Sequence, residues 1–446
     1  MKYSATWESI NSRPTPTWFT DARFGVFIHW GVYSVPAWAP KGTYAEWYWD
    51  AMRKREMTVE PNPNGYANAP TGREKGIWGK HVELYGEEFA YQDFAPRFSA
   101  ELFEPERWAR LFERSGARYV VLTSKHHDGF CLWPSQYAWN WNAVDIGAHR
   151  DLLGDLTAAV RARGLKMGYY YSLYEWFNPL YLQDPERYSL EHMHPQFREL
   201  VERYEPSIIY SDGEWDHPEE TWHSAELLAW LFNESPVRDD VVVNDRWGKD
   251  SRSKNGGFFT TEYGEVGAGK SLAANRPWEE IRGIGSSFGF NRNEELSDYL
   301  STRELVHLLV DTVSRGGNLC LNVGPTADGR IPVLQEERLV EIGDWLQVNG
   351  SAIYRSNRWR EVSDGGTVRY TKVDDAVYAI ALKWPGERLE LNAPEPSRET
   401  IVTLLGHGEP LNWEHENGRM SIEVPRIGPD ELPLRHAFVF QLTNVS

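Results

Sequence analysis

Short apolar runs alternate with amphipathic helical patterns through the first three quarters of the chain. The runs most typical of buried strands lie at residues 23–30, 119–125, 166–172, 207–211, 241–245, 258–262, 281–287 and 318–324. Because the runs are continuous rather than alternating, they predict strands that are buried on both faces. This rhythm constrains the fold more than any single motif, since such strands need helices to cover them.

The segments between several of these runs carry the spacing of helices. Apolar residues recur three and four positions apart at 105–117, 151–165, 194–204 and 302–317. Strands that are each followed by a helix or a long loop predict a (β/α)8 barrel of the TIM type over residues 1–349. An open, doubly wound sheet is the alternative, but no GxGxxG follows the first run.

The pattern changes at about residue 350. Residues 333–350 predict the last helix of the barrel. Strand-like runs without helical spacing then follow at 367–373, 376–384, 388–394, 400–406, 419–425 and 436–443. They predict a small antiparallel β-sandwich over residues 350–446.

Charge and hydropathy restrict the partners of the chain. The formal net charge is −18, which argues against nucleic acid and against an anionic membrane surface. No run approaches the roughly 20 apolar residues of a membrane span, and MKYSATWESINSRPTP does not resemble a signal peptide, so we expect a cytoplasmic protein. Cys131 and Cys320 lie in apolar surroundings and are expected to be buried.

Tryptophan is unusually frequent, with 21 residues beside 22 Tyr and 18 Phe. Many of them stand next to Gly, Pro, Asn or Asp, in stretches such as HWGVYSVPAWAP, EWYWD and FCLWPSQYAWNWN. Indole faces pack well against sugar C–H groups, and the indole N–H bonds to hydroxyls. The alternative is that these residues pack an irregular core. We also expect a long loop at 58–80, where Pro, Gly and Asn are frequent.

Polar side chains follow most of the expected strands. They are His29, Lys125, His126, His127, Asp128, Tyr170, Tyr171, Ser172, Tyr210, Ser211, Asp212, Asn244, Asp245, Arg246, Glu262 and Tyr263. Burying such groups without partners is costly, so the motif KHHDGF at 125–130 must lie where a partner, water or ligand satisfies it. The carboxyl ends of barrel strands converge on a pocket, which is where we place these residues.

Two carboxylates in this ring, Asp212 and Glu262, predict glycoside hydrolysis. One carboxylate must stay ionised, and the other must hold a proton for the leaving oxygen. A cation such as Arg246 would lower the pKa of the first, and burial among aromatic residues would raise the pKa of the second. Each acid also has a non-catalytic interpretation. Asp212-Gly213 is a common turn dipeptide, and Glu262 could end a strand in a salt bridge.

Other classes of function stay open on these residues alone. We expect neither a metal nor a cofactor, because His126 and His127 are neighbours on a strand and should point to opposite faces, away from a shared ion with His29. A non-catalytic sugar-binding protein would show the same Trp-rich loops. A metal-dependent hydrolase or isomerase, or a glycosidase for another sugar such as an α-galactoside, would fit the same barrel.

Long blocks of the sequence resemble one family. FGVFIHWGVYSVPAW, AEWYW, KHHDGFCLWPS, GYYYSLYEW, SDGEWD, VVVNDRWG, SFGFNRNE and GGNLCLNVGPTADGRIP are similar to the α-L-fucosidases of glycoside hydrolase family 29. The resemblance implies a retaining exo-α-L-fucosidase with Asp212 as nucleophile, a mechanism that also allows transfucosylation. It implies that Phe288 faces the C6 methyl group. The implied substrate-binding residues are His29, Glu46, Trp47, His126, His127, Tyr171, Tyr210, Arg246 and Phe288.

The acid/base of this family has no fixed motif. We choose Glu262, with Glu279 and Glu280 in PWEE as the rivals. The resemblance implies a small-molecule or oligosaccharide fucoside as substrate and leaves the linkage, the aglycone and the oligomeric state open, a homo-oligomer being compatible with it.

Overall fold

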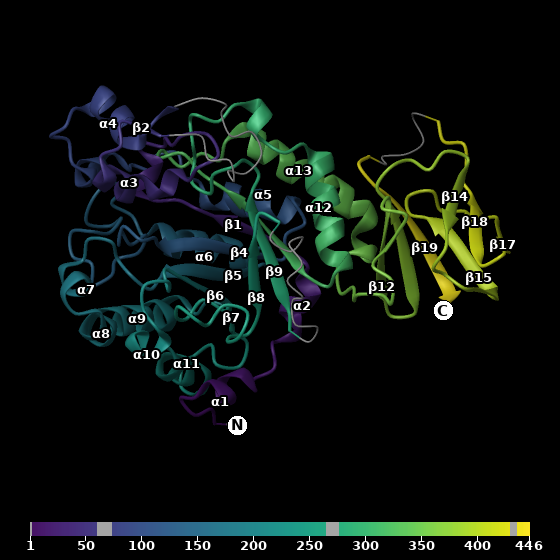
Figure 1. The fold of residues 1–446 in the computed structure, drawn as a ribbon, viewed down its shortest axis with the longest axis horizontal. Coiled ribbons are helices and arrows are strands. Elements are labelled where there is room, and N and C mark those ends of the chain that lie inside the picture. The colour runs from purple at the N-terminus through teal and green to yellow at the C-terminus, as the bar shows by residue number, and fades with distance from the viewer. Residues whose placement is uncertain (1, 60–73, 265–275, 429–434) are drawn as a thin grey trace.

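The computed structural model describes residues 2–59, 74–264, 276–428 and 435–446. Its larger part is a curled sheet of parallel strands in the order β7-β6-β5-β4-β1-β10-β9-β8. These strands are β1 (Phe24–Ile28), β4 (Tyr119–Lys125), β5 (Lys166–Ser172), β6 (Ile208–Asp212), β7 (Val242–Val243), β8 (Phe259–Glu262), β9 (Trp278–Gly283) and β10 (Asn318–Val323). Gly257 and Phe258 donate backbone hydrogen bonds to Val243 at 3.0 and 3.1 Å, which joins the two outer strands. The predicted barrel is thus confirmed (Figure 1).

Alternate residues of each strand serve two different cores. One set, with Phe27, Tyr119, Tyr170 and Tyr210, packs inside the barrel, and the other packs against the surrounding helices. Gly25 shows how tight the interior is, because a Cβ added there would come within 2.2 Å of the Tyr119 ring. Burial on both faces explains why the strands read as continuous apolar runs.

Helices surround the sheet. They are α1 (Trp7–Asn11), α2 (Thr17–Ala22), α3 (Tyr48–Lys54), α4 (Ile77–Tyr85), α5 (Pro105–Arg114), α6 (Leu152–Ala162), α7 (Pro179–Gln183), α8 (Pro185–Tyr188), α9 (His194–Tyr204), α10 (Glu219–Trp222), α11 (Ser224–Asn233), α12 (Thr302–Ser314) and α13 (Val333–Asn349). α12 begins with a capping box, in which Ser301 accepts from the Glu304 N–H and Glu304 accepts from the Ser301 N–H. The five predicted helices, α5, α6, α9, α12 and α13, are all present.

The C-terminal part is built of antiparallel strands, as predicted. One sheet has the order β11-β12-β13-β19-β15-β16, and a smaller one has the order β14-β18-β17. The strands are β11 (Ser363–Asp364), β12 (Val368–Val373), β13 (Ala376–Ala381), β14 (Arg388–Leu391), β15 (Pro396–Leu404), β16 (Pro410–Leu411), β17 (Trp413–Glu416), β18 (Arg419–Glu423) and β19 (Phe438–Val445). We propose the boundary between residues 349 and 350, at the end of α13.

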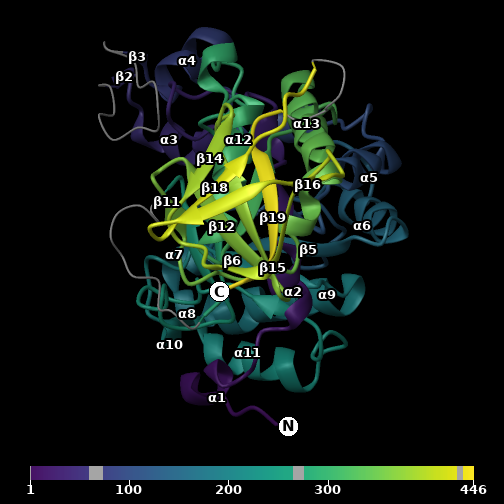
Figure 2. The ribbon, with the colours of Figure 1, turned by 90° about the vertical axis from the view of Figure 1, so that its right-hand side faces the viewer.

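This second domain lies against α12 and α13 on the side of the barrel away from α7 and α8 (Figures 1 and 2). Ile380 and Val439 pack into the core of the barrel domain. Trp345 Nε1 donates to the Ala437 carbonyl at 3.0 Å, and Arg369 forms an ion pair with Asp311 at 2.6 Å.

Two expectations from the sequence are wrong in detail. The seventh strand is Trp278–Gly283 rather than 281–287, so Glu279 and Glu280 lie within it. The start of this strand could not be predicted from hydrophobic runs, because its two glutamates interrupt the apolar pattern although they are buried. The 58–80 segment is not all loop, since β2 (Thr58–Val59) pairs with β3 (Glu74–Lys75) and α4 begins at Ile77. Residues 60–73 lie outside the described residues.

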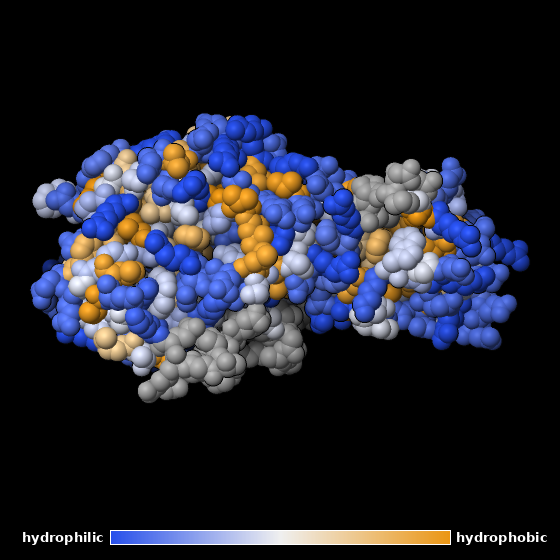
Figure 3. Space-filling model, turned by 90° about the horizontal axis from the view of Figure 1, so that it is seen from above, coloured by the Kyte–Doolittle hydropathy of each residue, from blue (hydrophilic) through white to orange (hydrophobic). Residues whose placement is uncertain are grey.

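Hydrophilic residues predominate on the face seen in Figure 3, where apolar residues form short strips. Among the described residues, no helix combines the length and apolarity that a membrane span requires. Cys131 and Cys320 are both buried and unpaired with each other, as expected.

Candidate active site

A cavity of about 190 Å³ opens where the carboxyl ends of the barrel strands meet. Its volume suits one monosaccharide. It is lined by Phe27, His29, Tyr44, Glu46, Trp47, His126, His127, Tyr170, Tyr210, Asp212, Trp215, Arg246, Arg252, Glu262, Ile281 and Phe288. The structure therefore brings together the residues predicted for the site, with the exception of Tyr171.

Asp212 is the last residue of β6, and its carboxylate is bonded on both oxygens. Oδ1 accepts from Arg246 Nη1 at 2.9 Å, and Oδ2 accepts from the Tyr170 hydroxyl at 2.9 Å. His127 Nε2 lies 3.6 Å from Oδ2. Burial alone would raise the pKa of Asp212, but Arg246, with His127 and Arg252, lowers it to about 2. This carboxylate is therefore ionised throughout the neutral range.

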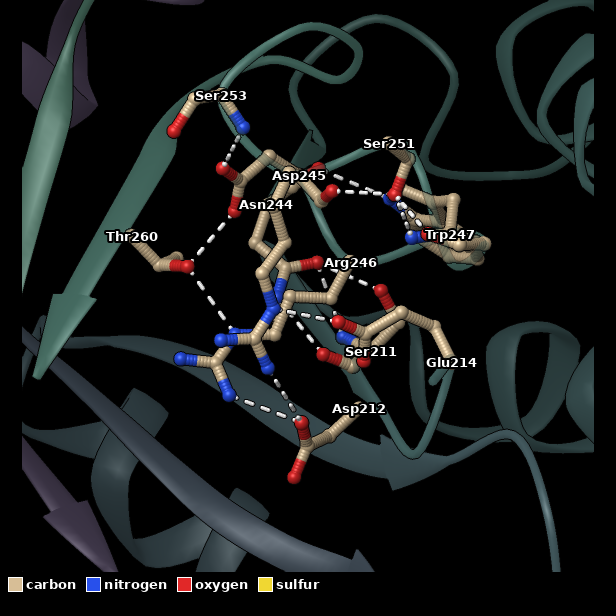
Figure 4. A network of polar contacts seen from close by, with 12 residues as sticks. Ser211, Asp212, Glu214, Asn244, Asp245, Arg246, Trp247, Ser251, Ser253 and Thr260 are labelled. Carbon is tan, nitrogen blue, oxygen red and sulfur yellow. Dashed lines mark hydrogen bonds and ion pairs between the residues drawn. The ribbon is translucent and has the colours of Figure 1, made fainter. Parts of the chain in front are cut away.

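Arg246 joins the two candidate carboxylates. Its Nη1 contacts Asp212, and its Nη2 forms an ion pair with Glu262 Oε1. Its Nε donates to Thr260 Oγ1 at 3.1 Å, and Thr260 in turn donates to Asp245 Oδ1 at 2.7 Å (Figure 4). Asp245 thus positions the arginine and does not line the cavity. The Glu262 side chain is 24% exposed against 10% for Asp212, so water reaches Glu262 more readily.

Three neutral histidines stand on one side of the cavity. Burial is the main reason that the pKa values of His29 and His127 are lowered to about 4. His29 Nδ1 donates to Asn322 Oδ1 at 2.6 Å, because the Asn322 amide nitrogen already donates to the Phe288 carbonyl. The His29 Nε2 atom is then left as an acceptor for a sugar hydroxyl.

His126 and His127 both line the cavity, contrary to the expectation that they face opposite ways. β4 ends at Lys125, so the strand alternation no longer applies to the two residues that follow. His127 Nδ1 is bonded to Ser172 Oγ at 2.7 Å. No group of three or more His, Cys, Asp or Glu side chains suited to a metal ion is present in the described part of the chain.

Tyr171 does not belong to the site, which corrects the sequence prediction. Its hydroxyl bonds to Gln196 Oε1 at 2.8 Å and to the Met193 carbonyl at 3.2 Å, on the outer side of the sheet beneath α9. Tyr170 is the inward residue. Successive side chains of a strand point to opposite faces, so an error of one position moves a tyrosine out of the pocket.

Lys125 also faces outward, and its partners explain why a lysine is buried there. Its ammonium group is 0% exposed and donates to Glu175 at 2.8 Å, Gln196 at 3.0 Å and the Tyr171 hydroxyl at 3.3 Å. Glu175 precedes Trp176, whose backbone N–H donates to the His127 carbonyl at 2.9 Å. The ion pair therefore holds the loop that follows β5 against the loop that follows β4 and carries His126 and His127.

The rival acids lie away from the cavity. Glu279 accepts a short hydrogen bond from Tyr119 inside the barrel, and burial raises its pKa to about 8. Glu280 accepts from Thr261 Oγ1 and from the Gly264 N–H. Neither residue lines the cavity, whereas Glu262 does.

The remaining walls combine one buried acid with aromatic rings. Glu46 accepts from the Gly289 N–H at 2.8 Å, and burial raises its pKa to about 7. Trp47 lies against His127, with ring centroids 5.4 Å apart. Phe288 stacks on His29 at 4.9 Å and closes an apolar wall with Phe27 and Ile281.

Sequence reasoning missed some lining residues and gave Tyr210 only the general role of a substrate-binding residue. Tyr44, Trp215 and Arg252 lie in loops, where no periodic pattern marks a direction, although Trp215 belongs to the SDGEWD block. Tyr210 lies beneath the guanidinium of Arg246, whose central carbon is 5.3 Å from the ring centroid. This position gives Tyr210 a packing role against that cation.

Comparison with known proteins agrees with this geometry. Residues 1–351 match the family model for α-L-fucosidase, and residues 363–443 match that for the α-L-fucosidase C-terminal domain. The plasma α-L-fucosidase of Rattus norvegicus is 45% identical over 461 residues, covering 100% of this chain and 95% of the relative. The tissue α-L-fucosidase of Homo sapiens is 41% identical over 455 residues, with 100% and 92% covered.

Solved structures give the same answer. A Thermotoga maritima α-fucosidase in complex with a mechanism-based inhibitor has a TM-score of 0.83 and 37% identity over 99% of this chain and 100% of that one. A trapped covalent intermediate of a Bacteroides thetaiotaomicron α-L-fucosidase has a TM-score of 0.76 and 26% identity, covering 96% and 95%. This chain therefore belongs to the α-L-fucosidase family and is a glycoside hydrolase.

Proposed function

We propose that this α-L-fucosidase removes terminal α-L-fucosyl groups with retention of anomeric configuration, through a covalent fucosyl-enzyme on Asp212. The observation that carries the proposal is the single guanidinium of Arg246, which contacts both Asp212 and Glu262. One guanidinium thus holds both carboxylates in the same cavity, where one can face the anomeric carbon and the other the leaving oxygen. We expect between them the ~5–5.5 Å separation of retaining enzymes.

The roles of the two acids follow from their surroundings. In the first step, Asp212 forms a bond to the anomeric carbon while the bond to the leaving oxygen breaks, and Glu262 gives that oxygen its proton. In the second step, Glu262 takes a proton from water, whose oxygen displaces Asp212 and releases L-fucose. A sugar hydroxyl in place of that water would give transfucosylation.

The polar groups of the cavity support this sequence of steps. The Tyr170 hydroxyl and Arg246 hold the Asp212 carboxylate in one orientation. The ion pair between Arg246 and Glu262 fits the ionised form of Glu262, which is the form that accepts a proton from water in the second step. Neutral His29 and His127 offer hydrogen bonds to sugar hydroxyls without adding charge.

The apolar wall supports fucose rather than its C6-hydroxylated counterpart. Phe27, Ile281 and Phe288 offer the sugar no hydrogen-bonding side-chain atom, so a methyl group is stabilised there and a hydroxyl group loses its water contacts. The Thermotoga maritima α-fucosidase structures with fucose and with a mechanism-based inhibitor support the same substrate class.

Azide rescue tests both assignments on an aryl α-L-fucoside. Asp212→Ala should lose several orders of magnitude in kcat, and added azide should restore turnover with formation of the inverted β-L-fucosyl azide. Glu262→Ala with azide should give the retained α-L-fucosyl azide, because the fucosyl-enzyme still forms. Glu280→Gln is the matched control, since Glu280 lies near Glu262 but outside the cavity, and it should keep near-native kcat. Near-native activity of Asp212→Ala would contradict the proposal.

A further inference from the structure

A second arginine reaches the proposed nucleophile. Arg252 lies in the loop between β7 and β8 and lines the cavity, with its side chain 38% exposed. Its Nη2 is 3.7 Å from Asp212 Oδ1, and its Nε donates to Glu214 Oε1. Its guanidinium carbon is 5.9 Å from the centroid of the Trp215 ring. Arg252 thus contacts two carboxylates and one aromatic ring at the same point of the cavity.

Glu214 is the residue that holds Arg252 there. It follows Asp212 by two positions, and it is 1% exposed. Oε1 is bonded to Arg252, while Oε2 has no hydrogen-bond partner among the described residues. Burial and the nearby charge of Asp212 raise the pKa of Glu214. A carboxylate so deeply buried needs a cation beside it, and Arg252 is the one to which it is bonded.

The charges facing Asp212 come from several elements. His127 follows β4, Tyr170 belongs to β5, and Arg246 follows β7, with Glu262 and His29 further around the cavity. The two histidines are neutral above about pH 4. Arg246 and Arg252 are therefore the cavity-lining residues of the described chain that carry positive charge at neutral pH.

The charges of Arg246, Arg252 and the carboxylates that contact them balance at both stages of the proposed reaction, on which this inference rests. Before attack, the anions in contact with the two arginines are Asp212 and Glu214, while Glu262 carries its proton. In the covalent intermediate, the anions are Glu262 and Glu214, because Asp212 is an ester. Arg246 and Arg252 supply two positive charges in each case.

We infer that Arg252, held by Glu214, is a positioning residue that keeps Asp212 ionised as the second cation beside Arg246. Arg246 is divided between Asp212 and Glu262, whereas Arg252 places a second guanidinium 3.7 Å from Asp212. The relevant effect is on the protonation of the nucleophile rather than on binding of fucose.

The test is the pH dependence of kcat/KM for an aryl α-L-fucoside, followed down to the lowest pH at which each variant stays folded. Arg252→Met keeps the aliphatic stem and removes the charge. The acidic limb of the kcat/KM profile of Arg252→Met should move to higher pH by about one unit or more, because an opposite charge within ~4–6 Å lowers an acid's pKa by 1–3 units. KM at neutral pH should change little.

Two further variants separate electrostatics from structure. Glu214→Gln should not move the acidic limb upward, because Arg252 keeps its charge. The double variant Arg252→Met/Glu214→Gln removes one charge of each sign, so its limb should return toward that of the parent chain. The acidic limb of Arg252→Lys should lie between those of the parent chain and Arg252→Met, because lysine keeps the charge but loses the planar set of guanidinium N–H donors. Circular dichroism and the denaturation midpoint of each variant report whether the fold is retained.

An acidic limb of Arg252→Met that overlays that of the parent chain would overturn the inference. A uniform loss of kcat at all pH values without displacement of the limb would overturn it as well, since it would indicate a structural role. The azide rescue of Asp212→Ala distinguishes the two levels of the argument. If the β-L-fucosyl azide forms and the acidic limb of Arg252→Met does not move, the role of Arg252 alone is wrong. If the β-L-fucosyl azide does not form, the assignment of Asp212 as the nucleophile is wrong.

Discussion

Replacing Lys125 by Met removes the charge from one of the most deeply buried ion pairs of the barrel. The ammonium group is 0% exposed, and its partner Glu175 is 10% exposed. Burial would raise the pKa of Glu175, but Lys125 and then His192 hold it well below its ordinary value. Removing one partner of a buried pair leaves the other charge uncompensated, which costs about 3–5 kcal/mol. We expect Lys125→Met to lower the free energy of unfolding by that amount at pH 7.

The same residues determine how this loss changes with pH. The pKa of Glu175 is depressed in the folded protein, so the pair contributes stability above the ordinary pKa of a glutamate and loses it as pH falls. The destabilisation of Lys125→Met should therefore be largest at neutral pH and shrink below about pH 4.5. Because Glu175 precedes Trp176, which is bonded to the His127 backbone, KM for the fucoside should also rise.

Guanidinium denaturation at pH 7 and pH 4 measures these differences. Lys166→Met is the matched control, because Lys166 forms an exposed ion pair with Asp240 and should cost at most ~1 kcal/mol. The double variant Lys125→Met/Glu175→Gln leaves no buried charge unpaired and should be more stable than Lys125→Met. A cost below about 1 kcal/mol for Lys125→Met would refute the reasoning, since it would equal that of an exposed pair.

Three other predictions follow from the geometry. Tyr170→Phe removes the hydroxyl bonded to Asp212 and should lower kcat/KM by about 10- to 100-fold, since hydrogen bonds to charged groups are worth ~1.5–3 kcal/mol; Tyr171→Phe should stay near the parent value, and equal losses in the two variants would contradict the assignment of faces. Glu279 has a raised pKa, about 8, so its contribution to stability falls as pH rises from ~4.5 to 8. The free energy of unfolding of Glu279→Gln should exceed that of the parent by an amount that grows across this range, and a constant difference would show that Glu279 does not titrate there. Phe288→Ala should reduce the preference of kcat/KM for an aryl α-L-fucoside over the α-L-galactoside by about tenfold or more, as the removal of apolar contact with one carbon does; an unchanged ratio would remove Phe288 from methyl recognition.

The sequence predicted elements whose burial is uniform. Strands such as Tyr119–Lys125 and Lys166–Ser172 lie between the barrel interior and the helices, so every position is apolar or paired, and their bounds were predicted to the residue. β9 was misplaced because Glu279 and Glu280 are ionisable residues in buried positions, which hydropathy cannot reveal. Their partners, Tyr119 and Thr261, come from other strands and are known only in three dimensions.

The site was predictable to the extent that it lies at strand ends. Asp212 and Glu262 close β6 and β8, and both line the cavity. The resemblance pointed to Tyr171, and the sequence could not correct this to Tyr170 because adjacent tyrosines carry no mark of which face of the sheet they take. Arg252 was missed because its position depends on the path of a loop and on Glu214, a contact across 38 residues of sequence.

The account depends most on a double displacement at the anomeric carbon. Proton NMR of an aryl α-L-fucoside during its first turnovers tests this directly, before mutarotation mixes the anomers. α-L-Fucose should appear first, and the β-anomer only later. Initial release of β-L-fucose would mean a single displacement by water and would contradict the assignment of Asp212 as a nucleophile.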